Sequence, residues 1–477
     1  METNLQKSIG TWEVTVAGVA LVVAASTLVS DFTGYFQLGI GFAISLLFAF
    51  GINLLLGISA ADLSVSYPRA GALYEFIKEI IKGKIGQMIA TLVAITFLGV
   101  LAFGLSGETA AGAFGLQALV SMDVDMNLFI VLLVVAGAIP NIFGIKTTAW
   151  LNAGLLLLML GIRWAFGLAG FFGVGETGTW SFDNLLVSGG INWFGTTGII
   201  TAGLALAFWS FVGIEFACSL AEEVKSPRKS LPKGIIFGLF GILLTSLIMG
   251  LGVTGTLPLG DWQHAVASEL GQNGNAPQLA VGYLMFGKIG YLLMALASVA
   301  ATLGSLSVAL AAFPRLIYSL ARDNNFFGPL SKIFGKLHPK FKTPINAILL
   351  CSVILLVPAL FSSAVVDWLY SAAYIWIVIY IVYHILAIIN RYQNPEVKGI
   401  FSNKIIYLSG ITGIVATSIT LYFAFLGGHG LYGKRALIVL GIASLFTLIS
   451  FALKYFNKEK YIYINENKLK PQSVNSK

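Results

Sequence analysis

The chain has 477 residues, of which 57% are apolar and 10% are charged, and its mean hydropathy is +0.86. Water-soluble domains carry about 25% charged residues, so this composition excludes a soluble globular protein and predicts an all-α polytopic membrane protein. The net charge of +8 does not indicate nucleic-acid binding, because the basic residues are concentrated in loops between apolar segments.

Apolar runs of about 20 residues predict twelve transmembrane helices. They lie near residues 12–33, 38–60, 86–118, 127–146, 150–172, 197–219, 234–256, 280–320, 344–362, 366–390, 405–426 and 434–455. The third and the eighth exceed the thickness of a bilayer and are expected to tilt or to extend beyond it. Lys and Arg gather in the loops on the amino-terminal side, so we expect a multi-pass protein of the plasma membrane with both termini cytoplasmic.

The first predicted span carries small and hydroxyl-bearing residues in its middle, at Ala24, Ala25, Ser26 and Thr27. Such residues predict either close helix–helix packing or an unwound segment that binds a small molecule. Secondary transporters place their substrate where two interrupted helices meet near the middle of the membrane. The sequence of this span leaves both interpretations open.

Two charged residues lie inside the third and fifth predicted spans. Glu108 either attracts an amine toward an outer vestibule or accepts a hydrogen bond from a neighbouring helix. Arg163 either supplies a fixed positive charge where other carriers bind sodium, or extends its guanidinium to the outer membrane interface. We prefer the second interpretation for Arg163. Both residues are candidates for coupling or gating.

The sixth predicted span is interrupted by a glycine and a carboxylate. Phe208, Trp209, Ser210 and Gly213 are the predicted substrate-binding residues of this span, because an indole offers a flat face to an ammonium or to an aliphatic chain. A packing role for Trp209 is the alternative. Glu215 is the predicted proton-coupling or gating group, since burial disfavours the charged form of a carboxyl group; a structural hydrogen bond is the alternative for Glu215.

The loop after the sixth span carries Glu222 and Glu223, with Lys225 and Arg228 close by. This pattern predicts a solvated charge cluster or a latch that closes the cytoplasmic side.

No motif in this sequence indicates an enzyme. A phosphate-binding glycine loop, a metal-ligand cluster and a nucleophilic triad are not evident, so we expect neither cofactor nor metal. Cys218 and Cys351 both fall in apolar segments, so no disulfide-linked partner subunit is expected.

Several motifs, in the order of the chain, resemble those of the amino acid, polyamine and organocation permeases. The motifs are Tyr67–Tyr74 after the second span, Asn141–Lys146 before the fifth, Phe208–Glu215 with the loop to Pro232, and Arg315–Asp323 at the end of the eighth. The run Phe208–Glu215 is particularly similar to the arginine–agmatine and putrescine–ornithine antiporters.

The resemblance covers about residues 10–395 and implies a LeuT-like fold of two inverted five-helix repeats plus two carboxy-terminal helices. The repeats would be residues 12–172 and 197–390, and the additional helices 405–455. A cytoplasmic amino terminus at 1–11 and a basic cytoplasmic tail at 456–477 complete the expected organisation.

The chain departs from the family pattern at the first interrupted span. The family usually has Gly-Ser-Gly there, and bare backbone amides receive the carboxylate of the substrate, whereas this chain has Ala24, Ala25 and Ser26. An exposed helix start still attracts an anion, but the methyl groups occupy space that glycine leaves open. A decarboxylated amine is therefore an alternative substrate.

The sequence thus predicts a secondary active transporter that moves amino acids by alternating access, coupled to protons or working by exchange. A polyamine or organic-cation transporter or antiporter is the alternative, and a channel or a sensor is the alternative from another class. Ser305 and Ser307 make sodium a further coupling candidate. The expected partners are the small-molecule substrate, membrane lipid and protons, without nucleic acid.

Overall fold

The structure is a computed structural model that describes residues 9–69, 71–120, 124–187, 190–195, 198–396, 401–426 and 430–456. In chain order its α-helices are α1 Thr11–Val22, α2 Ala25–Leu38, α3 Ile40–Ser66, α4 Leu73–Ile80, α5 Gly83–Val120, α6 Met126–Phe143, α7 Ile145–Phe171, α8 Leu204–Trp209, α9 Pro227–Thr254, α10 Leu259–Ala267, α11 Pro277–Arg322, α12 Ser331–Phe334, α13 Ile345–Phe361, α14 Val365–Gln393, α15 Asn403–Leu426 and α16 Gly430–Phe456. The other helical turns are η1 Phe182–Leu185, η2 Ile199–Gly203, η3 Ile214–Glu223, η4 Glu269–Gly271 and η5 Gly328–Leu330.

The predicted all-helical membrane fold is confirmed, but the count of twelve spans is not. In the described residues ten helical segments are long and apolar enough to cross a membrane, or eleven if the bent pair α1 and α2 forms one span. The predicted span at 344–362 coincides with α13, whose 17 residues are fewer than the length required for that count. Each predicted span therefore coincides with helix, and the difference lies in the length of α13.

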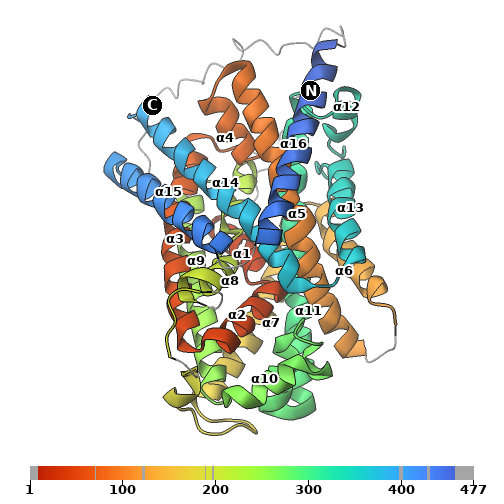
Figure 1. Cartoon of the computed structure of the whole chain (residues 1–477). Coiled ribbons are helices and arrows are strands. Elements are labelled where there is room, and N and C mark those ends of the chain that lie inside the picture. Colours follow the sequence, from red (N-terminus) through yellow and green to blue (C-terminus); the bar gives the residue numbers. More distant parts are fainter. Residues whose placement is uncertain are drawn as a thin grey trace, which may run out of the picture.

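The two longest predicted spans correspond to α5 and α11, which lie side by side through the molecule (Figure 1). Gly112 allows their close approach, because a Cβ atom there would lie 2.3 Å from Oγ1 of Thr302 on α11. α11 turns back near its start, where Phe286 and Gly287 have non-helical backbone angles. Its long straight part therefore begins after Gly287, later than the predicted start at 280.

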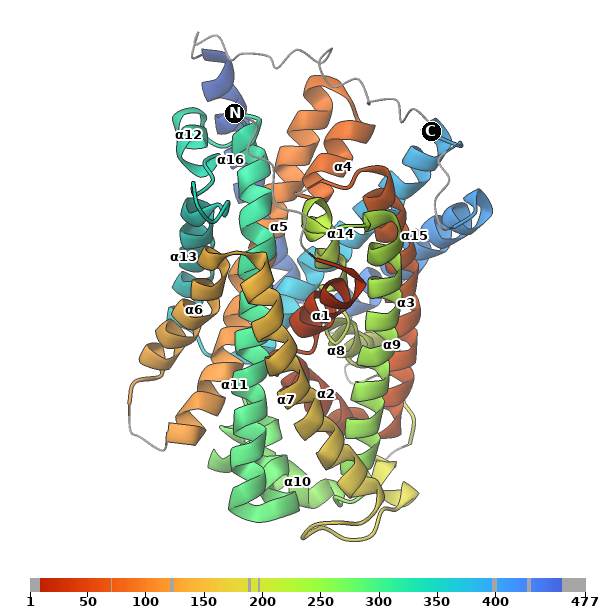
Figure 2. The ribbon, with the colours of Figure 1, turned by 180° about the vertical axis from the view of Figure 1, so that it is seen from behind.

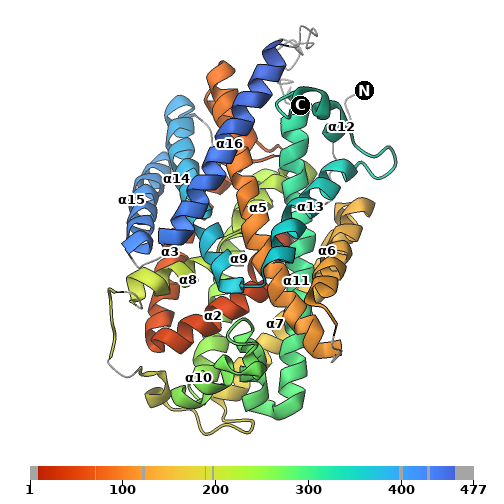
Figure 3. The same cartoon turned by 45° about the vertical axis from the view of Figure 1, so that its right-hand side comes forward.

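The interrupted helix α1 lies inside the bundle, packed against α7, α9, α11 and η3 (Figure 2). α15 packs against α3 and α14, and α16 packs against α5 and α14, so this pair lies at one side of the bundle (Figure 3). α10 lies at the end of the molecule opposite to α4 and α12.

The start of α1 and the end of α16 lie at the same end of the bundle. Ile9 pairs in parallel with Val224, directly after Glu223, which bonds to Arg315 of α11. Lys454 donates a hydrogen bond of 2.8 Å to Asn325, just after α11. The amino-terminal end of the described chain therefore contacts the end of η3, which Glu223 links to α11, and the carboxy-terminal end contacts the segment that follows α11.

Candidate functional site

The first predicted interruption is confirmed as a break in the helix. α1 ends at Val22, α2 begins at Ala25, and the two helices are bent by 55°. A helix that starts in the middle of a membrane exposes N–H groups that have no partner within the helix. Ala24, the residue before α2, has no side chain that could cap these groups, so their partner must come from elsewhere in the fold.

The second interruption lies between α8, which ends at Trp209, and η3, which begins at Ile214. Gly213 has φ +108°, a left-handed backbone conformation that glycine adopts without steric strain. A Cβ atom at this position would also lie 3.1 Å from the side chain of Leu21 on α1. Glycine therefore allows the helix to be interrupted here while the chain packs against the end of α1.

The two breaks face each other. Nε1 of Trp209 donates a hydrogen bond to Oγ of Ser26 at 3.1 Å, and Ser210 donates to Asp31 of α2 at 2.7 Å. A cavity lies between the breaks, and we call it the central cavity. Its lining residues are Leu21, Val22, Ala24, Ser26, Thr27, Gly104, Leu105, Glu108, Trp209, Val212, Ser305 and Trp376. Two segments far apart in the sequence thus share one small, mostly apolar site.

Glu108 of α5 supplies the partner that the start of α2 requires. Its carboxylate oxygens accept hydrogen bonds from the backbone N–H groups of Ala25 at 3.0 Å and Ser26 at 2.8 Å. Thr302 of α11 donates a third bond to the carboxylate at 2.7 Å. Of the two predicted roles, the structure shows hydrogen bonding to a neighbouring helix, and it also places Glu108 on the wall of the central cavity.

The preferred sequence interpretation of Arg163 is wrong. Its side chain is 1% exposed and its Nη2 atom lies 2.6 Å from the carboxylate of Asp31, so it does not extend to the membrane interface. Asp31 also accepts a hydrogen bond from Ser246 of α9 at 2.9 Å. A buried ion pair lowers the cost of both charges, and here it ties α2 to α7 and α9 directly beside the central cavity.

Glu215 lies just after the second break and is 1% exposed. Its carboxylate accepts hydrogen bonds from the N–H group of Gly213 at 3.1 Å, from the indole of Trp376, and from Tyr380 at 3.4 Å. In the described part of the chain no Lys, Arg or His forms an ion pair with it. A buried carboxylate with only neutral partners is costly to ionise, so the surroundings of Glu215 favour its protonated form.

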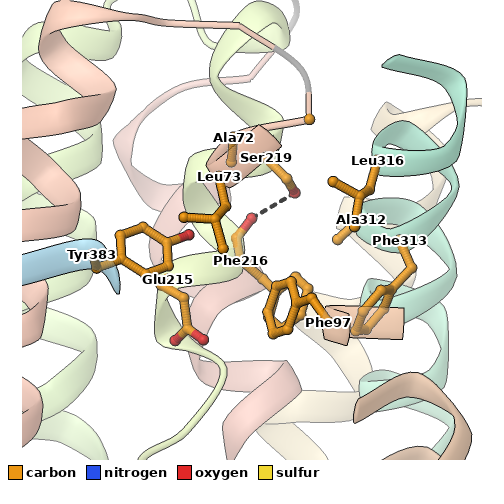
Figure 4. Close-up of a pocket in the computed structure, with 11 residues that line it drawn as sticks. Ala72, Leu73, Phe97, Glu215, Phe216, Ser219, Ala312, Phe313, Leu316 and Tyr383 are labelled. Atoms are coloured by element: carbon orange, nitrogen blue, oxygen red, sulfur yellow. Dashed lines mark hydrogen bonds between the residues drawn. The ribbon is translucent and has the colours of Figure 1, made fainter. Parts of the chain in front are cut away.

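A second cavity lies on the side of Trp376 that faces α4, and we call it the inner cavity. Figure 4 shows Glu215, Tyr383 and the rings of Phe97, Phe216 and Phe313 in its wall. Trp376, which lines the central cavity, lies 5.8 Å from Phe216 and 6.0 Å from Phe97 between ring centroids. A cluster of aromatic rings therefore separates the two cavities.

Ion pairs close the end of the molecule beyond the inner cavity. Glu223 pairs with Arg315 of α11 at 2.5 Å, and Glu75 of α4 pairs with Arg322 of α11 at 3.0 Å. The sequence predicted a solvated charge cluster or a latch for Glu222 and Glu223. Glu223 is 3% exposed, so it is not solvated, and the pairs of Glu223 with Arg315 and of Glu222 with Arg322 connect this segment to α11.

Lys78 adds a further link between α4 and the residue that follows α11. It pairs with Glu75 at 2.9 Å and with Asp323 at 2.7 Å. Burial alone would lower the pKa of the Lys78 ammonium, but these two carboxylates outweigh it, and the pKa of Lys78 lies above its ordinary value. Lys78 therefore stays charged, and the α4–α11 contact is an ionic one.

The predicted site residues divide into two groups. Ala24, Ser26, Thr27, Trp209 and Glu108 line the central cavity, and the amide of Ala25 holds Glu108. Phe208, Ser210, Gly213, Glu215 and Arg163 shape or surround it without appearing in its lining: Phe208 packs against Tyr380, with ring centroids 5.1 Å apart. Whether these residues act on a substrate remains a prediction.

Sequence reasoning missed Trp376, Thr302 and Asp31. Asp31 carried a usable signal, because it is an ionisable residue inside a predicted span. Trp376 and Thr302 had no such signal, since an aromatic or hydroxyl residue in an apolar helix is common and the facing helix cannot be inferred from it.

Comparison with known proteins identifies what this chain is similar to. A family model described as "Amino acid permease" matches residues 9–451. The branched-chain amino acid permease BcaP of Bacillus subtilis (strain 168) is 25% identical over an alignment of 374 residues that covers 72% of this chain and 72% of that protein. Cationic amino acid transporter 4 of Mus musculus is 26% identical over 76% of this chain, which spans only 56% of the mouse protein. A methylthioribose transporter of Bacillus subtilis (strain 168) is 24% identical over 88% of both chains.

Proposed function

The chain belongs to the amino acid permease family and is an amino acid transporter of the membrane, and we propose that its substrate binds in the central cavity between the two broken helices. The chain covers most of the length of BcaP and only about half of the mouse transporter. Branched-chain and cationic amino acids are the classes to examine first, because BcaP and cationic amino acid transporter 4 are named for them.

The observation that carries this proposal is the meeting of the two breaks at Ser26 and Trp209. Secondary transporters bind substrate at such a meeting point, because unwound backbone and half-helix ends expose N–H and C=O groups. In an intact helix these groups are hydrogen-bonded within the helix. Trp209 offers an indole face to the ammonium or side chain of the substrate, and the carbonyl end of α1 offers acceptors. The aromatic cluster and the ion pairs at the α4 end would form successive barriers on one side.

A decarboxylated amine is the second candidate substrate, favoured by one observation. Glu108 already occupies the two N–H groups at the start of α2 where a substrate carboxylate would bind. An amine has no carboxylate and would leave Glu108 in position. The paired screen described below therefore compares each amino acid with its own amine.

We propose the remaining features of the transport cycle on general grounds. The segments 12–172 and 197–390 act as two inverted repeats, and movement of one part of each repeat against the rest opens the cavity to either side in turn. The basic loops put both termini on the cytoplasmic side of the plasma membrane, so the α4 end is the cytoplasmic gate.

The test of the function is a ligand-stabilisation screen of the purified protein. Each of the standard amino acids is added in excess, in parallel with its decarboxylated amine, and the unfolding temperature is measured. A ligand at 100 times its dissociation constant stabilises the native state by about 2.7 kcal/mol, which such a screen detects. We expect a defined class of amino acids to stabilise the protein, and we expect proteoliposomes to take up the same class. A screen in which no amino acid stabilises the protein would contradict the proposal.

We predict that Ser26→Val weakens substrate binding by about fivefold, the effect of losing one net hydrogen bond of about 1 kcal/mol. The substitution removes the acceptor of Trp209 and adds a methyl group to the cavity wall. The dissociation constant of the ligand found in the screen measures the effect. Ser352→Val on α13 is the control, because that hydroxyl donates within its own helix to Ile348. If Ser26→Val binds the ligand with the same affinity as the parent, the first break does not belong to the binding site.

We predict that Glu215→Gln flattens the pH dependence of net uptake and leaves substrate binding largely intact. The amide keeps the shape of the side chain and most of its hydrogen bonds but cannot take up a proton, so protons no longer bias the equilibrium between the open states. Between about pH 5 and 8, parental uptake should change by roughly fivefold or more and uptake by the variant by less than about twofold.

Proteoliposome uptake of the same ligand measures this difference, and Glu176→Gln, in an exposed loop, is the matched control. A parental pH profile in Glu215→Gln would make Glu215 a structural residue, and the coupling group would then have to be another one.

A further inference from the structure

We propose that the carboxylate of Glu108 occupies the binding site of the substrate carboxylate until an amino acid binds. The amino acid then displaces the Glu108 carboxylate from the amides of Ala25 and Ser26, and Glu108 becomes protonated. The inference rests on the proposed function, since it assumes that an amino acid binds in the central cavity. It concerns the binding step, whereas the prediction for Glu215 concerns the equilibrium between open states.

The geometry of Glu108 is that of a bound carboxylate ligand. One oxygen accepts from the N–H group of Ala25 at 3.0 Å and the other from Ser26 at 2.8 Å, so the group bridges two successive amides of α2. Free N–H groups at a helix start, with the positive end of the helix dipole behind them, form an anion site. The side chain comes from α5, 83 residues away in the sequence from Ala25. The site is therefore complete before any substrate arrives.

The carboxylate of Glu108 has no cation to replace these bonds. In the described residues its partners are the two amides and Thr302, and the structure records no ion pair for it. Two other buried carboxylates near the site do have a cationic partner, because Asp31 pairs with Arg163 and Glu223 pairs with Arg315. In the described residues Glu215 resembles Glu108 in having neutral partners. Glu108 is 1% exposed and also lines the cavity that the proposal assigns to substrate.

Two carboxylates cannot use the same pair of amides. An arriving amino acid that delivers its carboxylate to Ala25 and Ser26 leaves Glu108 buried beside a like charge, and this strongly favours the neutral form of Glu108. The step takes up one proton from the bulk solution: the carboxylate of Glu108 gives up its two N–H bonds and gains the proton, and the substrate carboxylate gains the two N–H bonds. Release of the substrate reverses both changes, so substrate and proton travel through the cavity together.

The elements packed around Glu108 carry other charged and titratable groups, whereas the hydrogen bonds described for its carboxylate go to the amides of Ala25 and Ser26 and to Thr302. They include Asp31 and Tyr35 of α2 with Arg163 of α7, Glu215 of η3, Arg315, Tyr318 and Arg322 of α11, Cys351 of α13, Asp367, Tyr370, Tyr374, Tyr380, Tyr383 and His384 of α14, Arg435 of α16, and Glu75 and Lys78 of α4. Thr302, the side chain that contacts Glu108 from α11, is neutral. The proton taken up on amino acid binding is therefore assigned to Glu108.

The first test measures affinity as a function of pH for matched ligand pairs. L-leucine is compared with 3-methylbutylamine, and L-arginine with agmatine, by isothermal titration calorimetry on the full-length protein. Over the pH range in which Glu108 is ionised in the ligand-free protein, amino acid affinity should rise about tenfold for each pH unit of decrease. This slope is expected when binding is coupled to the uptake of one proton. The amine, which leaves Glu108 in place, should not show this increase.

Glu108→Gln separates this inference from other sources of pH dependence. The variant has no carboxylate to protonate, so its amino acid affinity should change by less than about twofold per pH unit and should exceed that of the parent at neutral pH. Glu176→Gln is the control and should retain the parental slope. An equal change of affinity with pH in the parent and in Glu108→Gln would overturn the proposal. If both proteins still bind amino acids in that case, the proposed function as an amino acid transporter is unaffected.

A second test needs no knowledge of the substrate. Glu108→Ala removes the atoms equivalent to one acetate ion, so sodium acetate should raise the unfolding temperature of this variant saturably and should not stabilise the parent. Glu108→Leu fills the same space with an apolar group and is the matched control, and sodium chloride controls for ionic strength. Failure of acetate to stabilise Glu108→Ala more than Glu108→Leu would contradict the anion site, whatever the outcome of the amino acid screen.

Discussion

Arg163→Met should lower the free energy of unfolding by about 3–5 kcal/mol, the cost of removing one partner of a buried ion pair. The substitution leaves the carboxylate of Asp31 buried without a cation, with only the hydroxyl groups of Ser210 and Ser246 as partners. Methionine approximates the length of the lost side chain, so little of the effect comes from an empty space. Unfolding in mixed micelles, followed by circular dichroism, measures the loss.

The double variant Arg163→Met with Asp31→Asn is the matched control for this prediction. It removes both charges and leaves neutral groups of similar shape, so it should recover a large part of the stability that the single variant loses. A single variant that loses less than about 1 kcal/mol would show that the ion pair does not stabilise the break region. Because the pair joins α2, α7 and the second break, the same variants should also impair transport.

Trp209→Ala should weaken substrate binding by about tenfold or more without preventing membrane insertion. The indole supplies a desolvated aromatic face worth up to about 2 kcal/mol to a cation, and its N–H group bonds to Ser26 at 3.1 Å. Its ring also lies against Trp376, with centroids 5.7 Å apart, so its removal loosens the wall between the two cavities. The dissociation constant of the ligand found in the screen measures the effect.

Two variants sharpen the interpretation of Trp209. Trp209→Phe keeps an aromatic face and loses the hydrogen bond, so its affinity should fall between those of the parent and of Trp209→Ala. Trp164→Ala removes an indole from α7 that bonds to Thr245 on α9, and it controls for a general loss of packing. Unchanged affinity in a correctly folded Trp209→Ala protein would reduce this residue to a packing role.

The pairing of Ile9 with Val224 bears on how the two breaks could move. The N–H group of Ile9 donates to the carbonyl of Glu223 at 3.1 Å, and that of Lys225 donates to Ile9 at 2.9 Å. These bonds connect the segment before α1 to the end of η3, so the half-helices on this side of the two breaks are held together. Any opening of the α4 end that moves α1 must therefore carry η3 with it or break this backbone pair.

The solvent, the positions of the spans and the interruption of the sixth span could be predicted from the sequence, which left the first span open between close packing and a break. Apolar length is a local property, and each predicted span coincides with helix in the structure. Gly213 and Glu215 indicated the break of the sixth span locally, because a glycine and a carboxylate are unusual together inside an apolar segment. The small residues Ala24–Thr27 are also compatible with close helix packing, so they did not settle the first break.

The partners of the charged residues were decided only by the tertiary structure. Glu108 contacts the start of α2, Arg163 contacts Asp31 across 132 positions, and Glu215 contacts Trp376 across 161 positions. A helix that is apolar on every side carries no amphipathic period from which its buried face could be inferred, so its rotation and its neighbours are not encoded in the local pattern. Long-range packing alone brought the carboxylate of Glu108 to the amides of α2, and that contact carries the strongest new expectation about this transporter.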